Sequence, residues 1–458
     1  MRRALVLLFV LLPTMAGAKA VLLAYGSLPG THSDRAVATA KRLADGVPGN
    51  RFGGLGSALD YAGCDTFLAL PDRGPNAVAW NRALDETTAY VNRVQTLRLT
   101  LAKAASDGRF PLQVQARLLK TTLLWSRERL RYGSGAGLHA ASGVPPLNAQ
   151  RHRFYFTGRS DGYDPAHASD WPGDARLDPE SLRLAPDGRS FYLGDEYGPH
   201  LYRFDRASGR RLGIVNLPAA LAVAHPAPTG AVETKRNARG RVGNHGLEGL
   251  AITPDGRTLI GAVQGALIQD GGAHGGFARL VRIDLVTGRM HSYAYPLQRV
   301  GGTDAKPRYA GISEIVAVND HVMLVDERGG GGAGSGQPAR IKRIYRIDLR
   351  GARAIDGLHG VRALAARAVH KHLFVDLVAR LGRHGITPAQ VPEKFEGLSF
   401  GRDVRVHGHW RHTLWVSTDN DFLPTPNRFL VVGFDDTDLP GLRRMPKPLR
   451  CRDVASRR

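Results

Sequence analysis

A short sequence unit recurs along the chain and constrains its fold more than any other feature. Two copies, which begin at Asp178 and Gly246, each consist of an apolar run, an Asp-Gly turn and a second apolar run. Further copies begin at Ile312 and Lys394, and a weaker one begins at Phe52. Because Asp-Gly between two alternating runs is a strong hairpin signal, the repeat predicts a series of β-hairpins.

A second pair of alternating runs follows these hairpins, for example at 200–205 and 278–284. Four antiparallel strands that recur along a chain are typical of a propeller blade. The expected fold class is therefore all-β, a β-propeller of about six four-stranded blades, with roughly five to seven allowed. The strand-like runs 94–101 and 114–125 are expected to form an additional blade.

Two stretches depart from the repeat. Apolar residues over 361–381 recur at helical spacing, which predicts a short helical insertion on the surface before the copy at Lys394. The run GGGGAGSG over 329–336 predicts an exposed connector. Its position directly after Arg328 also allows a loop over the channel mouth.

The first residues of the chain have the pattern of a secretory signal. Arg2 and Arg3 precede an apolar run, and small residues follow before position 21. That run is too short for a membrane-spanning helix, and no later stretch is long enough. We expect an exported protein, periplasmic or secreted. Its expected parts are a signal peptide at 1–20, an N-terminal segment at 21–47, the propeller at 48–435 and a basic tail at 436–458.

The two cysteines and the net charge exclude some classes of protein. Cys64 and Cys451 are too few for a zinc cluster, and they leave one disulfide or two unpaired thiols equally open. The net charge is +22, but no nucleic-acid-binding motif is present, and export separates the chain from the genome. A preference for arginine, steering of anionic molecules and attachment to an anionic surface all remain compatible with this charge. A monomer is the default expectation.

Acidic residues recur at matching positions of the repeat. The first strand of each blade lines a propeller's channel, so we expect these side chains to converge there. Converging carboxylates repel one another unless they are protonated or bridged by cations, and oxygen-rich sites suit Ca²⁺. The alternative is that each glutamate caps a turn within its own blade. The expected metal ligands are Glu180, Asp195, Glu196, Glu248, Glu314, Asp326, Glu327, Glu396, Asp419 and Asp421.

The same region contains candidates for catalysis. Arg73 and Arg328 follow acidic residues at strand ends and could clamp an anionic group. A cation with an arginine suits the hydrolysis of phosphate or carboxylic esters. No serine-hydrolase elbow, phosphate-binding loop or His-Glu-x-x-His zinc motif occurs. With His245, which is structural in the alternative reading, the expected catalytic residues are Glu248, Glu314, Arg73, Arg328 and His245.

Several short motifs together resemble the phytase-like family, bacterial exported proteins described as having esterase-like activity. The resemblance covers about residues 48–435 and implies a β-propeller, with kinship to calcium-dependent phytases that remove phosphate from inositol polyphosphates. The chain departs from the family pattern at Ser181, which replaces the usual Gly after Glu180, and at Gly54, where the other copies have Glu. The motifs are Pro71-Asp72-Arg73-Gly74-Pro75, Asp178-Pro179-Glu180, Gly194-Asp195-Glu196-Tyr197-Gly198-Pro199, Leu247-Glu248-Gly249-Leu250, Glu314, Asp326-Glu327-Arg328, Phe395-Glu396-Gly397 and Asp419-Asn420-Asp421-Phe422.

Three functions remain open at this level. The first is a metal-dependent hydrolase of phosphate or carboxylic esters that acts on an anionic small molecule. The second is a non-catalytic propeller with a structural calcium that binds a sugar, a peptide or an envelope partner. The third is a sugar-lactone hydrolase of propeller form.

Overall fold

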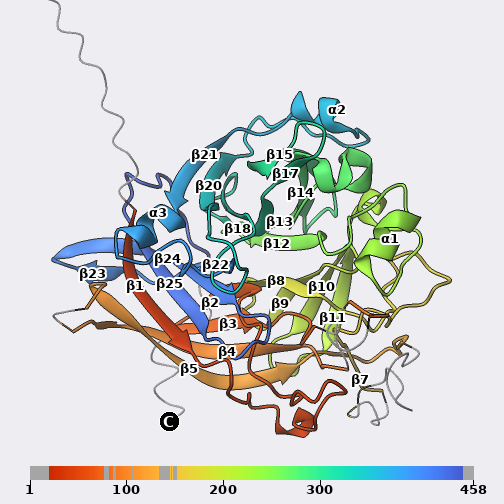
Figure 1. Ribbon diagram of the computed structural model, residues 1–458, viewed down its shortest axis with the longest axis horizontal. Helices are drawn as coiled ribbons and strands as arrows, with labels where there is room; N and C mark the ends of the chain where they lie inside the picture. The colour runs from red at the N-terminus through yellow and green to blue at the C-terminus, as the bar shows by residue number, and fades with distance from the viewer. Residues whose placement is uncertain are drawn as a thin grey trace, which may run out of the picture.

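Five four-stranded antiparallel units surround a central channel (Figure 1). The computed structural model describes residues 20–76, 82–85, 89–105, 108–133, 145, 147 and 152–446. Residues 1–19 of the expected signal peptide and Cys451 lie outside this set, so the disulfide stays a prediction. Cys64 lies in the turn between the first two strands of the first unit.

The units follow one another along the chain, each with its innermost strand first. The first two units contain β2 (Ala58–Gly63), β3 (Thr66–Leu70), β4 (Arg93–Lys103) and β5 (Leu112–Leu123), then β8 (Pro179–Leu184), β9 (Ser190–Asp195), β10 (His200–Asp205) and β11 (Arg211–Asn216). The next two contain β12 (Leu247–Ile252), β13 (Thr258–Val263), β14 (Phe277–Asp284) and β15 (Met290–Pro296), then β18 (Gly311–Ala317), β19 (Val322–Arg328), β20 (Lys342–Asp348) and β21 (Lys371–Asp376).

The N-terminal strand closes the ring. The fifth unit consists of β22 (Lys394–Phe400), β24 (His409–Asp419) and β25 (Asn427–Phe434), with β1 (Val21–Leu28) as its outer strand. β1 pairs with β25 in antiparallel fashion and with β5 of the first unit in parallel fashion. The propeller therefore includes part of the expected N-terminal segment.

Smaller elements lie between or beside the units. They are the two-stranded pairs β6 (Trp125–Ser126) with β7 (Phe154–Tyr155) and β16 (Arg299–Gly302) with β17 (Pro307–Tyr309), the strand β23 (Val404–Val406) beside β24, and the helix α1 (Gly230–Arg236). In the described part of the chain no helix is long and apolar enough to cross a membrane.

Two expectations from the sequence are wrong in detail. The runs 94–101 and 114–125 do form strands, but β4 and β5 complete the first unit and form no additional blade, so the described residues form five units, within the expected five to seven. The single helix expected over 361–381 is replaced by α2 (Val361–Ala365), the strand β21 and α3 (Leu377–Gly382). β20 needs an outer partner, and pairing with β21 outweighs the helical spacing of the apolar residues.

The apolar core is divided among the interfaces between neighbouring units. A buried cluster lies between each pair of neighbours, including the pair formed by the last and the first unit. The first strands contact one another in the order β2, β8, β12, β18, β22 and back to β2. This closed ring of first strands fixes which side chains meet on the axis.

An ion pair between Arg183 of β8 and Glu314 of β18 lies inside the channel, with 3.1 Å between Arg183 Nη2 and Glu314 Oε2. Both side chains are buried. The guanidinium also donates to one backbone carbonyl from each of four first strands, and Glu314 Oε1 accepts the Leu250 amide of the fifth at 2.9 Å. The carbonyls, with their distances, are Leu59 (3.1 Å), Leu182 (2.7 Å), Ile315 (2.9 Å) and Leu398 (3.0 Å).

We expect Arg183→Met to lower the free energy of unfolding by at least about 3 kcal/mol, because it leaves Glu314 and the carbonyls without their buried donor. The matched control is Arg203→Met. Arg203 pairs with Asp187 at 2.7 Å on the surface, where its side chain is 41% exposed. That variant should lose less than about 1 kcal/mol. Equal losses in denaturant unfolding would contradict a special role for the axial pair.

Candidate functional site

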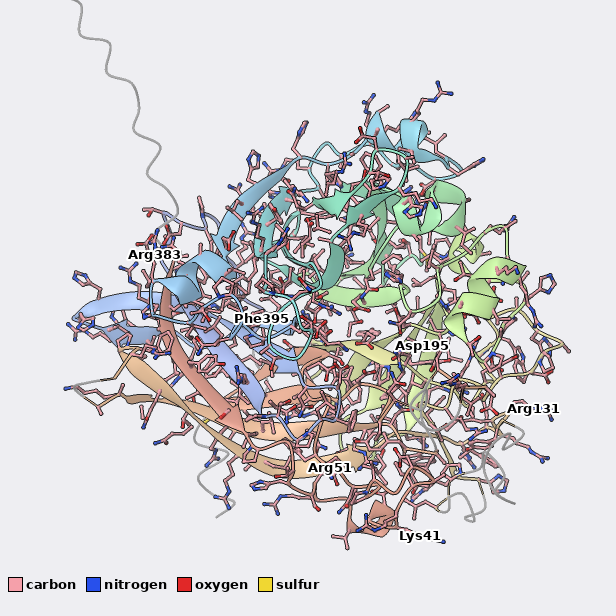
Figure 2. The ribbon with its side chains drawn as sticks, in the orientation of Figure 1. Lys41, Arg51, Arg131, Asp195, Arg383 and Phe395 are labelled. Carbon is pink, nitrogen blue, oxygen red and sulfur yellow. The ribbon has the colours of Figure 1, made fainter. Side chains whose placement is uncertain are left out.

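The channel mouth lies where the first strands begin. In four of the five first strands one extra residue interrupts the pairing with the second strand there. Such β-bulges re-aim a side chain and are common beside functional sites. The extra residues of the first three bulges are Glu180, Glu248 and Ser313. In β22 the two residues Glu396 and Gly397 lie opposite the single residue Ser417, and Glu396 occupies the matching position. Figure 2 labels Phe395 and Asp195, which lie beside this mouth in β22 and β9.

The fourth unit differs from the expectation. Ser313, and not Glu314, occupies the position that matches Glu180 and Glu248. Glu314 comes one residue later and is directed to Arg183 inside the channel. A one-residue offset in a strand moves a side chain to the opposite face, so Glu314 does not join the other three glutamates.

Each second strand brings one residue to the mouth. This residue is the last of the strand or lies one or two positions after it. Backbone contacts to the start of the first strand define this shared position. Two of the five residues are not acidic. The residues are Asp72, Glu196, Gln264, Arg328 and Asp419.

Three acidic residues expected at the mouth lie one or two positions earlier in the second strands. Their carboxylates contact other groups or are fully buried. Asp195 accepts the backbone amides of Asp178 at 3.0 Å and Tyr197 at 3.1 Å. Glu327 accepts hydrogen bonds from Tyr295 and Lys371 between two units. Asp326 is fully buried without a hydrogen-bond partner, and burial raises its pKa to about 8.

The carboxylates at the mouth lie close together; we call them, with their cations, the acidic ring. Asp72, Asp178 and Glu180 place ligand oxygens within 4.8 Å of one another. The same holds for Glu180, Glu196 and Glu248, and for Asp72, Asp419 and Asp421. Since the groups share Asp72 and Glu180, they form one continuous site. The ring carboxylates are Asp72, Asp178, Glu180, Glu196, Glu248, Glu396, Asp419 and Asp421.

Three cations interrupt the acidic ring. Arg73 Nη1 contacts Asp178 and lies 3.2 Å from Glu196 Oε2. Lys394 Nζ lies 2.9 Å from Asp419 Oδ2 and also contacts Asp421. These cations neutralise only part of the ring, because the carboxyl groups outnumber them.

Arg328 compensates for the missing glutamate of its own unit. Its Nε donates to Ser313 Oγ at 2.8 Å, and its Nη2 lies 2.7 Å from Glu396 Oε1 and 3.9 Å from Glu248 Oε1. Ser313 is short, and this leaves room for the guanidinium between two glutamates. At this position the fourth unit therefore supplies a positive charge, whereas the third unit supplies the neutral Gln264 and the other three supply a carboxylate.

Burial and mutual repulsion act on the ring carboxylates. Burial raises the pKa of Glu180 well above its usual range, and the charges of Asp72, Asp178, Glu248 and Glu396 raise it further. No hydrogen bond to the Glu180 carboxylate occurs within the described ranges. A site of buried carboxylates without enough positive charge is suited to a bound cation.

The donor atoms indicate the kind of cation. Within the described residues the three groups offer carboxylate oxygens only. Hard oxygen ligands suit Ca²⁺, which accepts 6–8 of them, and do not suit metals that prefer thiolate or imidazole. The residues present thus fit a calcium ion.

His245 lies at the edge of the site. Its Nδ1 is 3.2 Å from the Gly243 carbonyl, and the following amide, that of Gly246, donates to Glu196 Oε1 at 2.8 Å. His245 borders a small cavity with Tyr309. Its expected catalytic role stays a prediction.

Asp72, Asp178 and Lys394 were missed as site residues in the sequence. Asp72 lies two residues after the second strand, β3, of a unit whose first strand lacks the glutamate, which hid its equivalence to Glu196 and Asp419. Asp178 directly precedes the Pro-Glu pair of the repeat and belongs to one of the family motifs, but the matching residues of the later copies, Gly246, Gly311 and Lys394, are not acidic.

The family model for phytase-like proteins, described as "esterase-like activity of phytase", matches residues 50–422. The chain belongs to the phytase-like family. An uncharacterized secreted protein of Arthroderma benhamiae is 28% identical over 320 residues, which are 60% of this chain and 54% of that protein. The chain thus spans about half the length of the curated relative that it matches.

Solved structures give only distant likenesses. The periplasmic gluconolactonase PpgL of Pseudomonas aeruginosa is 12% identical, with 85% of this chain and 88% of that chain covered and a TM-score of 0.31. A putative 6-phosphogluconolactonase of Bacteroides uniformis is 11% identical, with 81% and 82% covered and a TM-score of 0.28. Likenesses at these TM-scores carry no argument about activity.

We expect Glu180→Gln to raise the melting temperature in the presence of a chelator, and more so at pH 8 than at pH 5. The folded pKa of Glu180 lies above the unfolded value of about 4.5, so the wild-type protein loses stability as the pH rises beyond that value. Glutamine has no proton to lose.

In excess calcium the wild-type protein should have the higher melting temperature. The variant lacks one negatively charged ligand, so binding of the cation stabilises it less. The control is Glu128→Gln, whose carboxylate is 81% exposed and pairs with Arg211. It should follow the wild type in both conditions. If calcium raised the melting temperature of Glu180→Gln as much as that of the wild type, this would contradict a cation site that includes Glu180.

Proposed function

We propose that the acidic ring binds a calcium ion and that the protein is an exported hydrolase of phosphate or carboxylic esters. The observation that carries the proposal is the position of Glu180, within 4.8 Å of both the Asp72–Asp178 and the Glu196–Glu248 pairs. The family's description supports ester hydrolysis. The signal pattern at 1–20 and a relative named as secreted support export.

Asp72, Asp178, Glu180, Glu196 and Glu248 would hold the cation. A divalent cation at such a site polarises an ester oxygen and lowers the pKa of water. Arg73 is buried against Asp178 and Glu196, so it orients these carboxylates and does not face a substrate.

Arg328 is placed to bind the anionic part of an ester. Its side chain is 17% exposed, against 8% for Arg73, and it lies between Glu248 and Glu396. A guanidinium presents several donors in a fixed plane, which suits phosphate or carboxylate oxygens. Part of its charge is already balanced by Glu396, so it orients the substrate more than it attracts it from a distance.

Asp421 is the ring carboxylate most open to solvent. Its side chain is 45% exposed, whereas that of Asp419 is 1% exposed. It lies at the edge of the ring beside Lys394, where an attacking water could transfer a proton to it. Lys394 fixes its orientation through their contact.

The test is turnover of phytate, p-nitrophenyl phosphate, p-nitrophenyl acetate and a sugar lactone by the mature protein, with calcium or with a chelator. We expect calcium-dependent turnover of one ester class. Glu248→Gln should lower it at least about 100-fold, because it removes one of the charges that hold the cation. Glu128→Gln should leave it unchanged.

Arg328→Ala should raise KM for an anionic ester at least about tenfold while leaving the calcium-induced rise in melting temperature in place. Failure to hydrolyse any of the compounds, together with a calcium-raised melting temperature, would contradict the enzymatic part. It would leave a binding propeller with a structural metal.

A further inference from the structure

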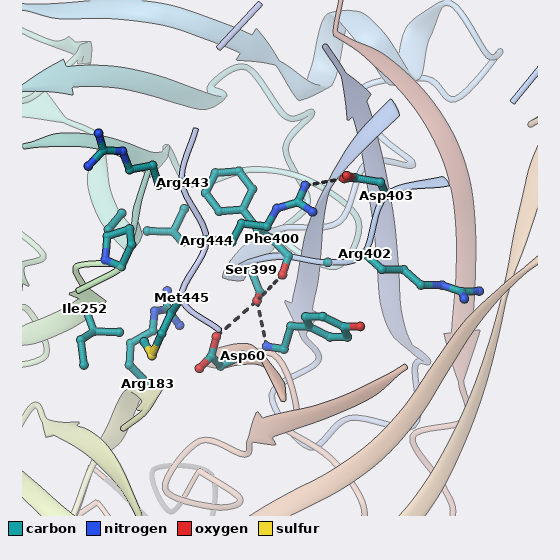
Figure 3. Close-up of a pocket in the computed structure, with 15 residues that line it drawn as sticks. Asp60, Arg183, Ile252, Ser399, Phe400, Arg402, Asp403, Arg443, Arg444 and Met445 are labelled. Atoms are coloured by element: carbon teal, nitrogen blue, oxygen red, sulfur yellow. Dashed lines mark hydrogen bonds and ion pairs between the residues drawn. The ribbon is translucent and has the colours of Figure 1, made fainter. Parts of the chain in front are cut away.

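The end of the channel opposite the acidic ring contains a cavity of about 270 Å³ (Figure 3). Residues from all five first strands, or from the turns that follow them, line it, and Arg183 forms part of its lining. Arg183 is the same side chain that crosses the channel axis. The axial ion pair therefore separates this cavity from the acidic ring.

The C-terminal segment, residues 441–445, forms one wall of the cavity. Asn319 Nδ2 donates to the Gly441 carbonyl at 3.1 Å, and the Arg443 amide donates to the Val318 carbonyl at 2.8 Å. Arg444 Nη2 donates to Asp403 Oδ1 at 2.6 Å. These bonds hold the segment against the fourth and fifth units, so the wall is part of the folded structure.

The polar part of the lining is rich in donors. Four arginines and two aspartates line the cavity. Both aspartates already accept hydrogen bonds, Asp60 from the Leu184 amide at 2.8 Å and Asp403 from Arg444. Arg402 pairs with Asp65, which is not part of the lining. Arg443 pairs with Asp320 at 3.6 Å and Arg183 with Glu314 at 3.1 Å, and these acids also lie outside the lining. The excess of arginines over aspartates is therefore a property of the lining itself.

Arg183, which lines the cavity, has one donor atom without a partner. Arg183 is 2% exposed, and its Nε atom is buried with no hydrogen-bond partner. A buried donor without a partner costs about 1–3 kcal/mol. An acceptor on a bound molecule would remove that cost.

The remaining lining is apolar. Ile252, Val316, Phe400 and Met445 belong to the lining. Figure 3 shows Ile252 and Met445 beside Arg183. A site with an apolar body and a few convergent polar groups is the usual form of a small-molecule pocket. Its size suits a molecule of about ten to fifteen non-hydrogen atoms.

We propose that this cavity binds a small carboxylic acid with an apolar chain, separately from the acidic ring. The carboxylate accepts from Arg183 Nε and lies beside the other arginines of the lining. The chain packs against Ile252, Phe400 and Met445. No ring residue lines the cavity, so the site is independent of calcium and of ester hydrolysis.

Isothermal titration of the mature protein with octanoate tests the proposal. We expect one site, and binding at least tenfold weaker for octan-1-ol, which has the chain but not the charge. Binding should be unchanged by a chelator. Octanoate binding that is absent, or no tighter than that of octan-1-ol, would overturn the proposal.

Met445→Trp fills the cavity and should weaken octanoate binding at least tenfold. The matched control is Met290→Trp, because Met290 packs against the same apolar cluster as Met445 without lining the cavity. If Met445→Trp does not fold, a chain that ends at Leu442 lacks the wall and should show the same loss. Tight binding that survives loss of the wall would place octanoate elsewhere and overturn the assignment.

Discussion

The ion pair of Arg183 and Glu314 is the interaction on which the centre of this propeller depends. Its hydrogen bonds reach all five first strands, four through carbonyls and one through an amide. A channel lined by strands from distant parts of the chain needs something to fill its axis, and here a charged side chain does so. The pair also divides the channel into an acidic mouth and an apolar, donor-rich cavity.

The acidic mouth follows from the geometry of the repeat. A bulge at the start of a first strand and the residue at the end of the second strand are both directed at the axis. Repetition of this arrangement brings buried carboxylates together at a cost in stability, as the raised pKa of Glu180 indicates. The fourth unit reduces the repulsion with Ser313 and Arg328, which leaves an incompletely neutralised ring that a cation can complete.

The sequence predicted the hairpins and most of the converging glutamates, and the predictions that were wrong have physical causes. Asp-Gly turns between alternating runs correctly located the hairpins, and Glu180, Glu248 and Glu396 do converge at one mouth. Glu314 was assigned to the wrong position because a bulge has no sequence signature. Aligning the glutamates of the copies hid the fact that Glu314 lies one residue after the bulge position, which Ser313 occupies. An additional blade was expected because the spacing between the first copy of the repeat and Glu180 is longer than that between the other copies, but the two runs that suggested it are β4 and β5 of the first unit.

Calorimetric titration of calcium into chelator-treated protein at pH 7, in two buffers of different ionisation enthalpy, tests the central claim most directly. Burial and mutual repulsion raise the pKa of ring carboxyl groups, that of Glu396 to about 7, so a bound cation should displace protons and binding should be accompanied by proton release. The account predicts this release, and its loss in a variant whose ring carboxylates are replaced by amides. Absence of binding, or binding without proton release, would contradict a calcium site built from these carboxylates.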